Sequence, residues 1–300
     1  MGTIRHRGVG VRFVRGLSFL VILAAACGPT GASGRSGRLM VVTSLPPHAD
    51  LISRIAGDRA DVSFLVPPGA DPHTFEPLPE DMRRVAEADL YLTAGLPFED
   101  AWLPRIEGSS PGLRVASLTQ GIQLLREPGH GEGGPGGEPG DDPHTWMSPG
   151  LMAIEARNAE AALVSIDPAD SAGFASRLDT LLAAISALQV ELHSELDSLR
   201  GGVFLVAHPS YGYFADEFGL RQVAIEANGS EPSPAELAAF VDEARGSGAR
   251  FIIASPQFST RSAETVASEL GVPLVLHDPL ARDWMGGLRQ LGHDLSESGM

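Results

Sequence analysis

The sequence predicts an α/β protein with two lobes, each built on a mostly parallel sheet, joined by a long rigid helix. Short apolar runs alternate with helical patterns in both halves of the chain, as in parallel sheets covered by helices. Between the halves, apolar residues recur every three or four positions over 174–199, the spacing of one long helix. We therefore expect an N-terminal lobe over 39–166, a linker helix over 167–200 and a C-terminal lobe over 201–300.

Residues 1–26 indicate a secretory signal peptide. An arginine-rich segment precedes the apolar run 17–26, which is too short to span a membrane. Cys27 stands where bacterial lipoprotein signals, which this segment resembles, place the cysteine that is lipidated after cleavage. We expect a lipid anchor on Cys27, a flexible Gly- and Ser-rich tether over 27–38, and a location in the periplasm or on the outer face of the cell membrane. A plain signal peptide with an unmodified cysteine is the alternative.

The chain is acidic and has a single cysteine. A net charge of −16 argues against nucleic acid and anionic lipid as binding partners. One cysteine cannot form an internal disulfide. Any metal site in the mature chain must therefore use nitrogen and oxygen ligands.

The N-terminal lobe is predicted to alternate strands with helices. Its predicted strands are 39–43, 62–66 and 90–93, and its predicted helices are 48–55, 79–86 and 98–106. An insertion over 126–142, rich in glycine and acidic residues, predicts a mobile surface loop. The next helix should begin with Ser148 as its N-cap and Pro149 in its first position.

The linker helix and the C-terminal lobe follow. Asp167 and Pro168 should start the linker helix. The predicted strands of the lobe are 203–207, 222–225, 251–254 and 272–276, and its predicted helices are 211–218, 233–245 and 262–270. Ser233 and Glu236 form a capping box at the start of the second of these helices. The tail after Leu280 is weakly patterned and predicts one short helix, 284–291.

Two copies of Asp-Pro-His-Thr place His73 and His144 in the same local setting. A proline before a histidine fixes one backbone angle and keeps the residue before it extended, so each imidazole is held on a stiff loop. Histidine is the commonest metal ligand, and one shared ligand explains the repetition. Chance histidines in two Asp-Pro turns are the alternative.

His208 and Asp278 follow predicted strands of the C-terminal lobe, at the sheet edge where such folds bind ligands. Together with His73 and His144 they offer three imidazoles and one carboxylate, a set that suits four-coordinate zinc. Because both lobes contribute, the ion would lie in the cleft between them. For Asp278, a cap or turn role is the alternative, with water or His277 as the fourth ligand.

Further predictions concern residues near the proposed ligands and the remaining histidines. Glu226 could orient an imidazole, as metal-binding histidines usually require. His48 and His293 are predicted at the surface, and His193 at the surface or the rim of the cleft. The aromatic residues near the motifs are predicted to wall the cleft; they are Trp146, Tyr211 and Tyr213.

Six stretches occur in a characteristic order: PPGADPHTFEP at 67–77, ADLYLTAGLPFEDAWL at 88–103, DPHTWMSP at 142–149, HPSYGYFADEFGL at 208–220, EPSPAEL at 231–237 and HDPL at 277–280. Over about 39–280 the chain thereby resembles the metal-binding solute-binding lipoproteins of bacterial ABC importers for zinc and manganese. The resemblance implies two α/β lobes joined by a rigid helix, with the ion bound between them.

The same resemblance bears on the metal. The manganese branch typically carries a glutamate at the third ligand position, where this chain has His208, so the zinc branch is favoured. That branch often has a histidine-rich loop before the second motif, but here the insertion holds only His130, and Ser255-Pro256 stands where Glu-Pro is frequent. The implied function is a non-enzymatic, monomeric component that captures Zn²⁺ and delivers it to a membrane permease and its ATPase. Mn²⁺ or another divalent ion is the alternative cargo.

Two further functions remain as alternatives. A zinc hydrolase would need an open coordination position and a general base, and the sequence contains no HExxH motif. A surface adhesin with a structural metal would have the same fold.

Overall fold

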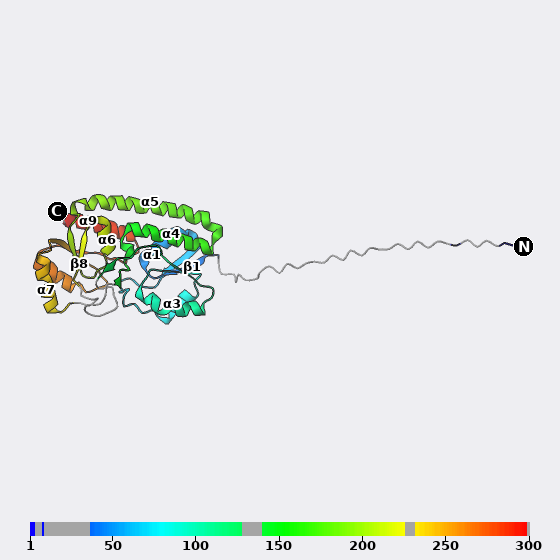
Figure 1. Ribbon diagram of the computed structural model, residues 1–300, viewed down its shortest axis with the longest axis horizontal. Coiled ribbons are helices and arrows are strands. Elements are labelled where there is room, and N and C mark those ends of the chain that lie inside the picture. Colours follow the sequence, from blue (N-terminus) through cyan, green and yellow to red (C-terminus); the bar gives the residue numbers. More distant parts are fainter. Residues whose placement is uncertain (4–7, 9–36, 128–139, 226–231, 299–300) are drawn as a thin grey trace. The chain divides into compact units, whose positions relative to one another are not determined.

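Two four-stranded parallel sheets organise the chain (Figure 1). The computed structural model describes residues 1–3, 8, 37–127, 140–225 and 232–298. Most of the predicted signal peptide and tether, Cys27, Glu226 and most of the 126–142 insertion lie outside these residues. Within the described part of the chain, no helix has the length and apolar character needed to cross a membrane.

The N-terminal sheet has the strand order β2-β1-β3-β4. Its strands are β1 (Leu39–Thr43), β2 (Ala60–Phe64), β3 (Leu90–Thr93) and β4 (Arg114–Ser117). The first three match the predicted strands to within two residues. The edge strand β4 was not predicted, because its sequence RVAS is half-exposed and lacks the apolar run of a buried parallel strand.

The C-terminal sheet has the order β10-β9-β7-β8. Its strands are β7 (Val203–Val206), β8 (Arg221–Ala224), β9 (Ala249–Ala254) and β10 (Leu274–Leu276). Read in chain order, both sheets have the arrangement 2-1-3-4. In such sheets ligands bind beyond the carboxyl ends of the strands, at the point where the order reverses, which lies here between β1 and β3 and between β7 and β9.

Nine helices accompany the sheets in the described residues: α1 (Pro46–Ala56), α2 (Pro79–Ala86), α3 (Pro97–Ser109), α4 (Pro149–Ile166), α5 (Ser171–Leu196), α6 (Gly212–Phe218), α7 (Pro234–Arg245), α8 (Arg261–Leu270) and α9 (Trp284–Ser298). Two of the three predicted helix starts are present; the third was wrong, because Asp167 and Pro168 begin a short 3₁₀ turn without a side-chain cap and α5 begins at Ser171. Ser148 Oγ accepts a hydrogen bond from the amide of Leu151 at the start of α4, and Ser233 and Glu236 form the predicted capping box at the start of α7.

The long helix α5 passes along both lobes (Figure 1). It has 26 residues, which corresponds to roughly 39 Å, and short 3₁₀ turns extend it at both ends. It packs on α1 and α4 of the N-terminal lobe and on α9. Its buried side chains are Phe174, Leu181, Ile185, Leu188, Leu192 and Leu196.

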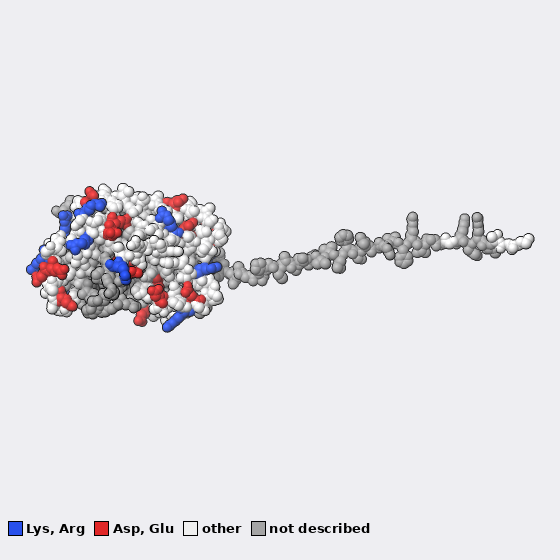
Figure 2. All heavy atoms as spheres, in the orientation of Figure 1, with Lys and Arg blue, Asp and Glu red and all other residues white. Residues whose placement is uncertain are grey.

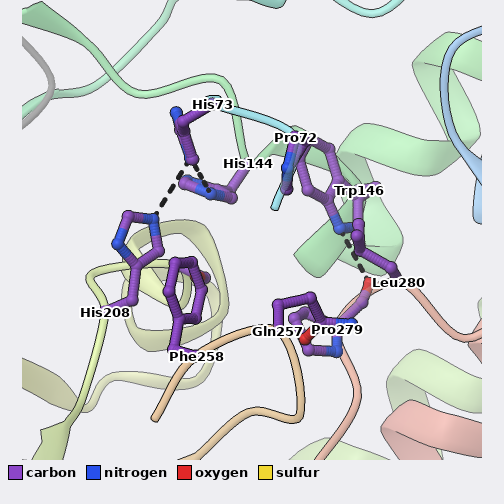
Figure 3. Close-up of a pocket in the computed structure, with 10 residues that line it drawn as sticks. Pro72, His73, His144, Trp146, His208, Gln257, Phe258, Pro279 and Leu280 are labelled. Carbon is purple, nitrogen blue, oxygen red and sulfur yellow. Dashed lines mark hydrogen bonds between the residues drawn. The ribbon is translucent and has the colours of Figure 1, made fainter. Parts of the chain in front are cut away.

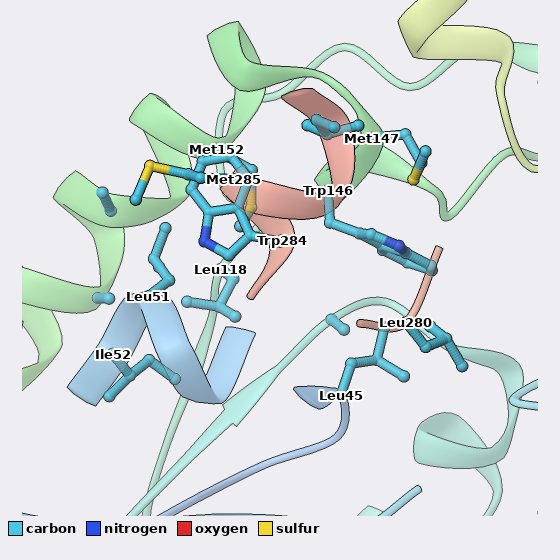
Figure 4. Packing of buried hydrophobic residues seen from close by; sticks show 14 of the residues in the cluster. Leu45, Leu51, Ile52, Leu118, Trp146, Met147, Met152, Leu280, Trp284 and Met285 are labelled. Carbon is cyan, nitrogen blue, oxygen red and sulfur yellow. The ribbon is translucent and has the colours of Figure 1, made fainter. Parts of the chain in front are cut away.

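The prediction of a short final helix was wrong. The helix α9 has 15 residues and continues to Ser298, where it contributes Trp284 and Met285 to a core shared with α1 and α4 (Figure 4). Its glycines weaken the helical signal in the sequence, and Gly292 lets it approach α5: an added Cβ there would overlap the side chain of Leu192.

Charged side chains of both signs are interspersed on the face of the molecule shown in Figure 2. The described part of that face carries no large patch of a single sign. The acidic excess of the chain is thus distributed rather than gathered into one binding surface on this side.

Candidate metal centre

Three histidines that are distant in the sequence converge in space (Figure 3). The Nε2 atom of His73 lies 3.2 Å from Nε2 of His144 and 3.2 Å from Nε2 of His208. One ring nitrogen from each of the three residues lies within 4.8 Å of the others. Two nitrogen ligands of a tetrahedral zinc ion are about 3.3 Å apart, since each Zn–N bond is about 2.0–2.1 Å long. The spacing therefore fits three ligands of one ion.

The two Asp-Pro-His-Thr copies fold alike at the backbone. The carboxylate of Asp71 accepts hydrogen bonds from the amide of His73, at 2.8 Å, and from the hydroxyl of Thr74. Asp142 accepts one from the amide of His144, at 2.9 Å. In both copies an aspartate caps the turn that presents the imidazole, which explains why the motif contains an aspartate two residues before the histidine.

Only Asp142 is seen to contact the ring of its histidine as well. Its Oδ1 atom lies 2.7 Å from Nδ1 of His144. A carboxylate accepts hydrogen bonds, so Nδ1 of His144 carries the proton and Nε2 presents a lone pair to the other histidines. Sequence reasoning did not assign this role to Asp142. The residue predicted to orient an imidazole, Glu226, lies outside the described residues.

Burial keeps His144 neutral. Its side chain is almost completely buried, and this burial, together with the neighbouring His208, lowers the pKa of His144 well below its usual value of 6.5. A neutral imidazole is the form that binds a metal, so the fold prepares this residue for coordination.

His208 follows β7, at the point where the strand order of the C-terminal sheet reverses. Phe258, in the loop after β9, stacks on its ring with a centroid separation of 4.4 Å and an interplanar angle of 23°. This contact fixes the imidazole plane. Phe258 was not singled out from the sequence, because no motif connects it with a histidine 50 residues earlier.

The three histidines line a small cavity whose volume, about 10 Å³, has room for about one water-sized particle. It is lined by Pro72, His73, His144, Trp146, His208, Ser210, Gln257, Phe258, Pro279 and Leu280. Of the aromatic residues predicted to wall the cleft, Trp146 lines this cavity, whereas Tyr211 and Tyr213 do not. Nε1 of Trp146 donates to the backbone oxygen of Pro279 at 2.9 Å. Half of the lining side chains are apolar, and they lower the polarity around the histidines, so charges inside the cavity interact more strongly than they would in water.

Asp278 is not among the residues that line this cavity. Its Oδ1 atom accepts hydrogen bonds from Nε2 of Gln257, at 2.6 Å, and from the amide of Leu280, at 2.9 Å. Its role as a fourth ligand stays a prediction. His277, the other candidate for that position, is buried and its Nδ1 lies 3.0 Å from the hydroxyl of Tyr211.

The surface prediction for His48 was wrong. Its side chain is 0% exposed, and Nε2 lies 2.9 Å from a carboxylate oxygen of Glu155, which is equally buried. Glu155 also accepts a hydrogen bond from Thr145, next to His144. His293 is exposed as predicted, and His193 is half-exposed and packs against Phe218.

Tyr213 connects α6 with the base of the insertion. Its hydroxyl accepts a hydrogen bond from the amide of Leu125, at 2.9 Å, and donates one to the backbone oxygen of Asp142, at 2.7 Å. The ends of the insertion pair as two short antiparallel strands, β5 (Arg126–Glu127) and β6 (Gly140–Asp141). The backbone of Asp142, whose carboxylate contacts the ring of His144, is therefore hydrogen-bonded to a helix of the C-terminal half.

Comparisons with known proteins agree on one family. Residues 41–292 match the family described as zinc-uptake complex component A, periplasmic (ZnuA). The high-affinity zinc uptake system protein ZnuA of Bacillus subtilis (strain 168) is 30% identical over 263 residues, which cover 83% of this chain and 82% of that protein.

A more distant relative is named for another metal. The iron ABC transporter substrate-binding lipoprotein MtsA of Streptococcus pyogenes serotype M1 is 26% identical over 278 residues, covering 89% of this chain and 88% of that protein. Among solved structures, a crystal structure of ZnuA is 33% identical, covers 88% of this chain and all of its own, and superposes with a TM-score of 0.80.

Proposed function

The chain belongs to the family of periplasmic zinc-uptake component A proteins, and from this premise we propose that Zn²⁺ is the ion it binds. It is the metal-binding component of an ABC importer. Its family consists of solute-binding proteins, so the proposed activity is capture and release without catalysis.

One observation carries the choice of zinc: three imidazole Nε2 atoms share a site at separations of 3.2 Å from His73. Imidazole nitrogen suits zinc, whereas manganese prefers sites rich in oxygen. The hydrogen bond from His144 to Asp142 supports a neutral ligand with its lone pair directed at the ion. We propose His73, His144 and His208 as ligands, with the fourth position open to Asp278 or to water.

The proposed ligands come from the two predicted lobes, 39–166 and 201–300, on either side of the linker helix 167–200. Such an arrangement lets an ion be held between lobes and given up when they separate. The proposed recipients are a membrane permease and its ATPase. We further propose a lipid anchor on Cys27, a monomeric state and a location outside the cytoplasmic membrane.

Competition between Zn²⁺ and Mn²⁺ for the purified mature chain tests the metal. A nanomolar dissociation constant corresponds to a binding free energy of about −12 kcal/mol. Binding this tight is measured by competition with a chromogenic chelator of similar affinity, which reports free zinc. We expect one Zn²⁺ per chain, preference for zinc over manganese, and loss of tight binding in His208→Ala. Tighter binding of manganese than of zinc would contradict the proposal.

Transport requires a test in cells. A strain that lacks the protein should grow poorly when zinc is chelated and recover when zinc is added. Recovery with manganese or iron, but not with zinc, would assign another cargo. If the strain that lacks the protein grew normally under zinc chelation but lost surface attachment, the adhesin alternative would be supported instead.

A further inference from the structure

We propose that Gln257 determines the metal selectivity of the histidine centre by holding the carboxylate of Asp278 away from the bound ion. The proposal rests on the proposed three-histidine centre and adds a selectivity-determining residue to it. Gln257 lies in the loop after β9, one residue before Phe258, which stacks on His208.

The hydrogen bond between these two side chains fixes the orientation of both. Nε2 of Gln257 donates to Oδ1 of Asp278 at 2.6 Å. An ionised carboxylate has no hydrogen to donate, so the amide must turn its NH₂ group toward Asp278 and its oxygen away from it. Hydrogen bonds to a charged acceptor are short and strong. The amide of Leu280 binds the same oxygen at 2.9 Å, so Asp278 is held from two directions.

The cavity lining agrees with this arrangement. Gln257 lines the cavity with His73, His144 and His208 (Figure 3). Asp278 is not among the lining residues. The three histidines form a group whose ligand atoms lie within 4.8 Å of one another, and no carboxylate among the described residues belongs to it. Gln257, and not Asp278, therefore borders the ion site.

The position of Asp278 decides which ligand atoms the protein offers to the ion. With Asp278 held by Gln257, the protein offers three imidazole nitrogens, which suit zinc. With Asp278 released, it would offer three nitrogens and a carboxylate oxygen. That set still suits zinc, but it adds the oxygen ligand that manganese prefers, so manganese gains more than zinc does. Removing the amide should therefore change selectivity more than it changes the ability to bind an ion.

Gln257→Leu is the variant of choice. It removes the amide that holds Asp278 and leaves a side chain of similar size. The variant also removes Oε1 of Gln257, a buried acceptor without a hydrogen-bond partner among the described residues. Because an unsatisfied buried acceptor is itself unfavourable, its loss offsets part of the lost hydrogen bond, and the variant should fold. The matched control is Gln290→Leu, which removes an amide–carboxylate hydrogen bond of 2.8 Å to Asp294 on α9, outside the cavity.

The experiment measures Zn²⁺ and Mn²⁺ dissociation constants by competition titration, after circular dichroism has verified the fold. We expect Gln257→Leu to lower the preference for zinc over manganese by about tenfold, mainly through tighter manganese binding. Gln290→Leu should leave the preference unchanged. Asp278→Asn should change zinc affinity by less than about fivefold in the natural background and should abolish the manganese gain in the Gln257→Leu background.

Two results would overturn the proposal. One is an unchanged zinc-to-manganese preference in Gln257→Leu. The other is a loss of zinc affinity of about fivefold or more in Asp278→Asn alone, since that would make Asp278 a ligand despite the hydrogen bond. Failure of the histidine centre is distinguishable, because it would appear as unaltered zinc binding in His73→Ala, His144→Ala and His208→Ala, whatever Gln257 does.

Discussion

Asp142 and His144 act as one unit, because a single carboxylate oxygen receives both the backbone amide and the ring Nδ1 of the histidine. The first hydrogen bond shapes the turn, and the second selects the tautomer that directs Nε2 toward His73. A metal-binding histidine usually depends on such a partner for its orientation and basicity.

Asp142→Ala should lower zinc affinity by about 10–100-fold, because His144 loses the group that orients it. Asp71→Ala is the matched control: it removes the equivalent backbone hydrogen bond to His73 in the other copy of the motif. Zinc affinity of both variants is to be measured with the same chelator. Equal losses would mean that capping of the turn, and not orientation of the ring, accounts for the effect.

The sequence reveals part of this site and conceals the rest. The repeated Asp-Pro-His-Thr motif makes His73 and His144 recognisable, but the two copies look identical, so the added contact of Asp142 depends on a ring orientation that only the folded chain defines. His48 was misplaced at the surface because its partner Glu155 lies 107 positions later. A buried polar pair of this kind leaves no local pattern.

At the scale of elements, α5 and α9 come together more closely than ordinary side chains would permit. A Cβ at Gly292 would overlap Leu192 and would lie 3.1 Å from Oε2 of Glu195. Both Leu192 and Gly292 are buried, so neither helix can shift without disturbing the core. The glycine that allows this contact also weakens the helical pattern in the sequence, which is why the length of α9 was underestimated.

Gly292→Ala should destabilise the protein by about 1–3 kcal/mol, because the added methyl group overpacks the helix contact. Gly108→Ala, in α3, is the control, since nothing lies within 4 Å of its added Cβ. It should be neutral or slightly stabilising, by up to about 1 kcal/mol. Urea unfolding of both variants provides the comparison, and equal midpoints would refute the close contact.

Strands were predicted correctly where the sequence contains a run of apolar residues. The strands β3 and β7 have the sequences LYLT and VFLV. Their buried positions form apolar runs, as expected for a sheet covered on both faces. The edge strand β4 was not predicted, because its sequence RVAS shows little alternation of apolar and polar residues and both of its ends are exposed. Its place in the sheet is decided by hydrogen bonds to β3, which are invisible in the sequence.

At the scale of the whole molecule, two buried histidines connect folding with pH. Burial lowers the pKa of His144 well below 6.5. Burial likewise lowers the pKa of His277 to about 4, with Asp278 acting in the opposite direction. Since the unfolded chain binds protons at these residues near pH 6.5, while the folded chain does not, stability must fall as the pH decreases below that value.

The metal-free chain should therefore be less stable at pH 5.5 than at pH 7.5, by about 1–3 kcal/mol. Urea unfolding in the presence of a chelator gives this difference. His277→Asn should reduce the difference, and His293→Gln, at an exposed position, should retain it. A stability that is constant over this range would contradict neutral burial of the two histidines.

Both sheets have the strand order 2-1-3-4, and the proposed ligands come from segments of both halves of the chain. The sequence predicted this two-lobed plan from its alternation of strands and helices. It could not show which side chains meet, because that depends on contacts such as the stacking of Phe258 on His208 and the hydrogen bond of Gln257 to Asp278.

X-ray absorption spectroscopy at the zinc edge of the loaded mature chain tests the central proposal most directly, since it reports the ligands of the ion itself. The account predicts three imidazole nitrogens at about 2.0–2.1 Å in the natural chain and two in His208→Ala. A spectrum with fewer than three imidazoles, or one that His208→Ala leaves unchanged, would contradict it.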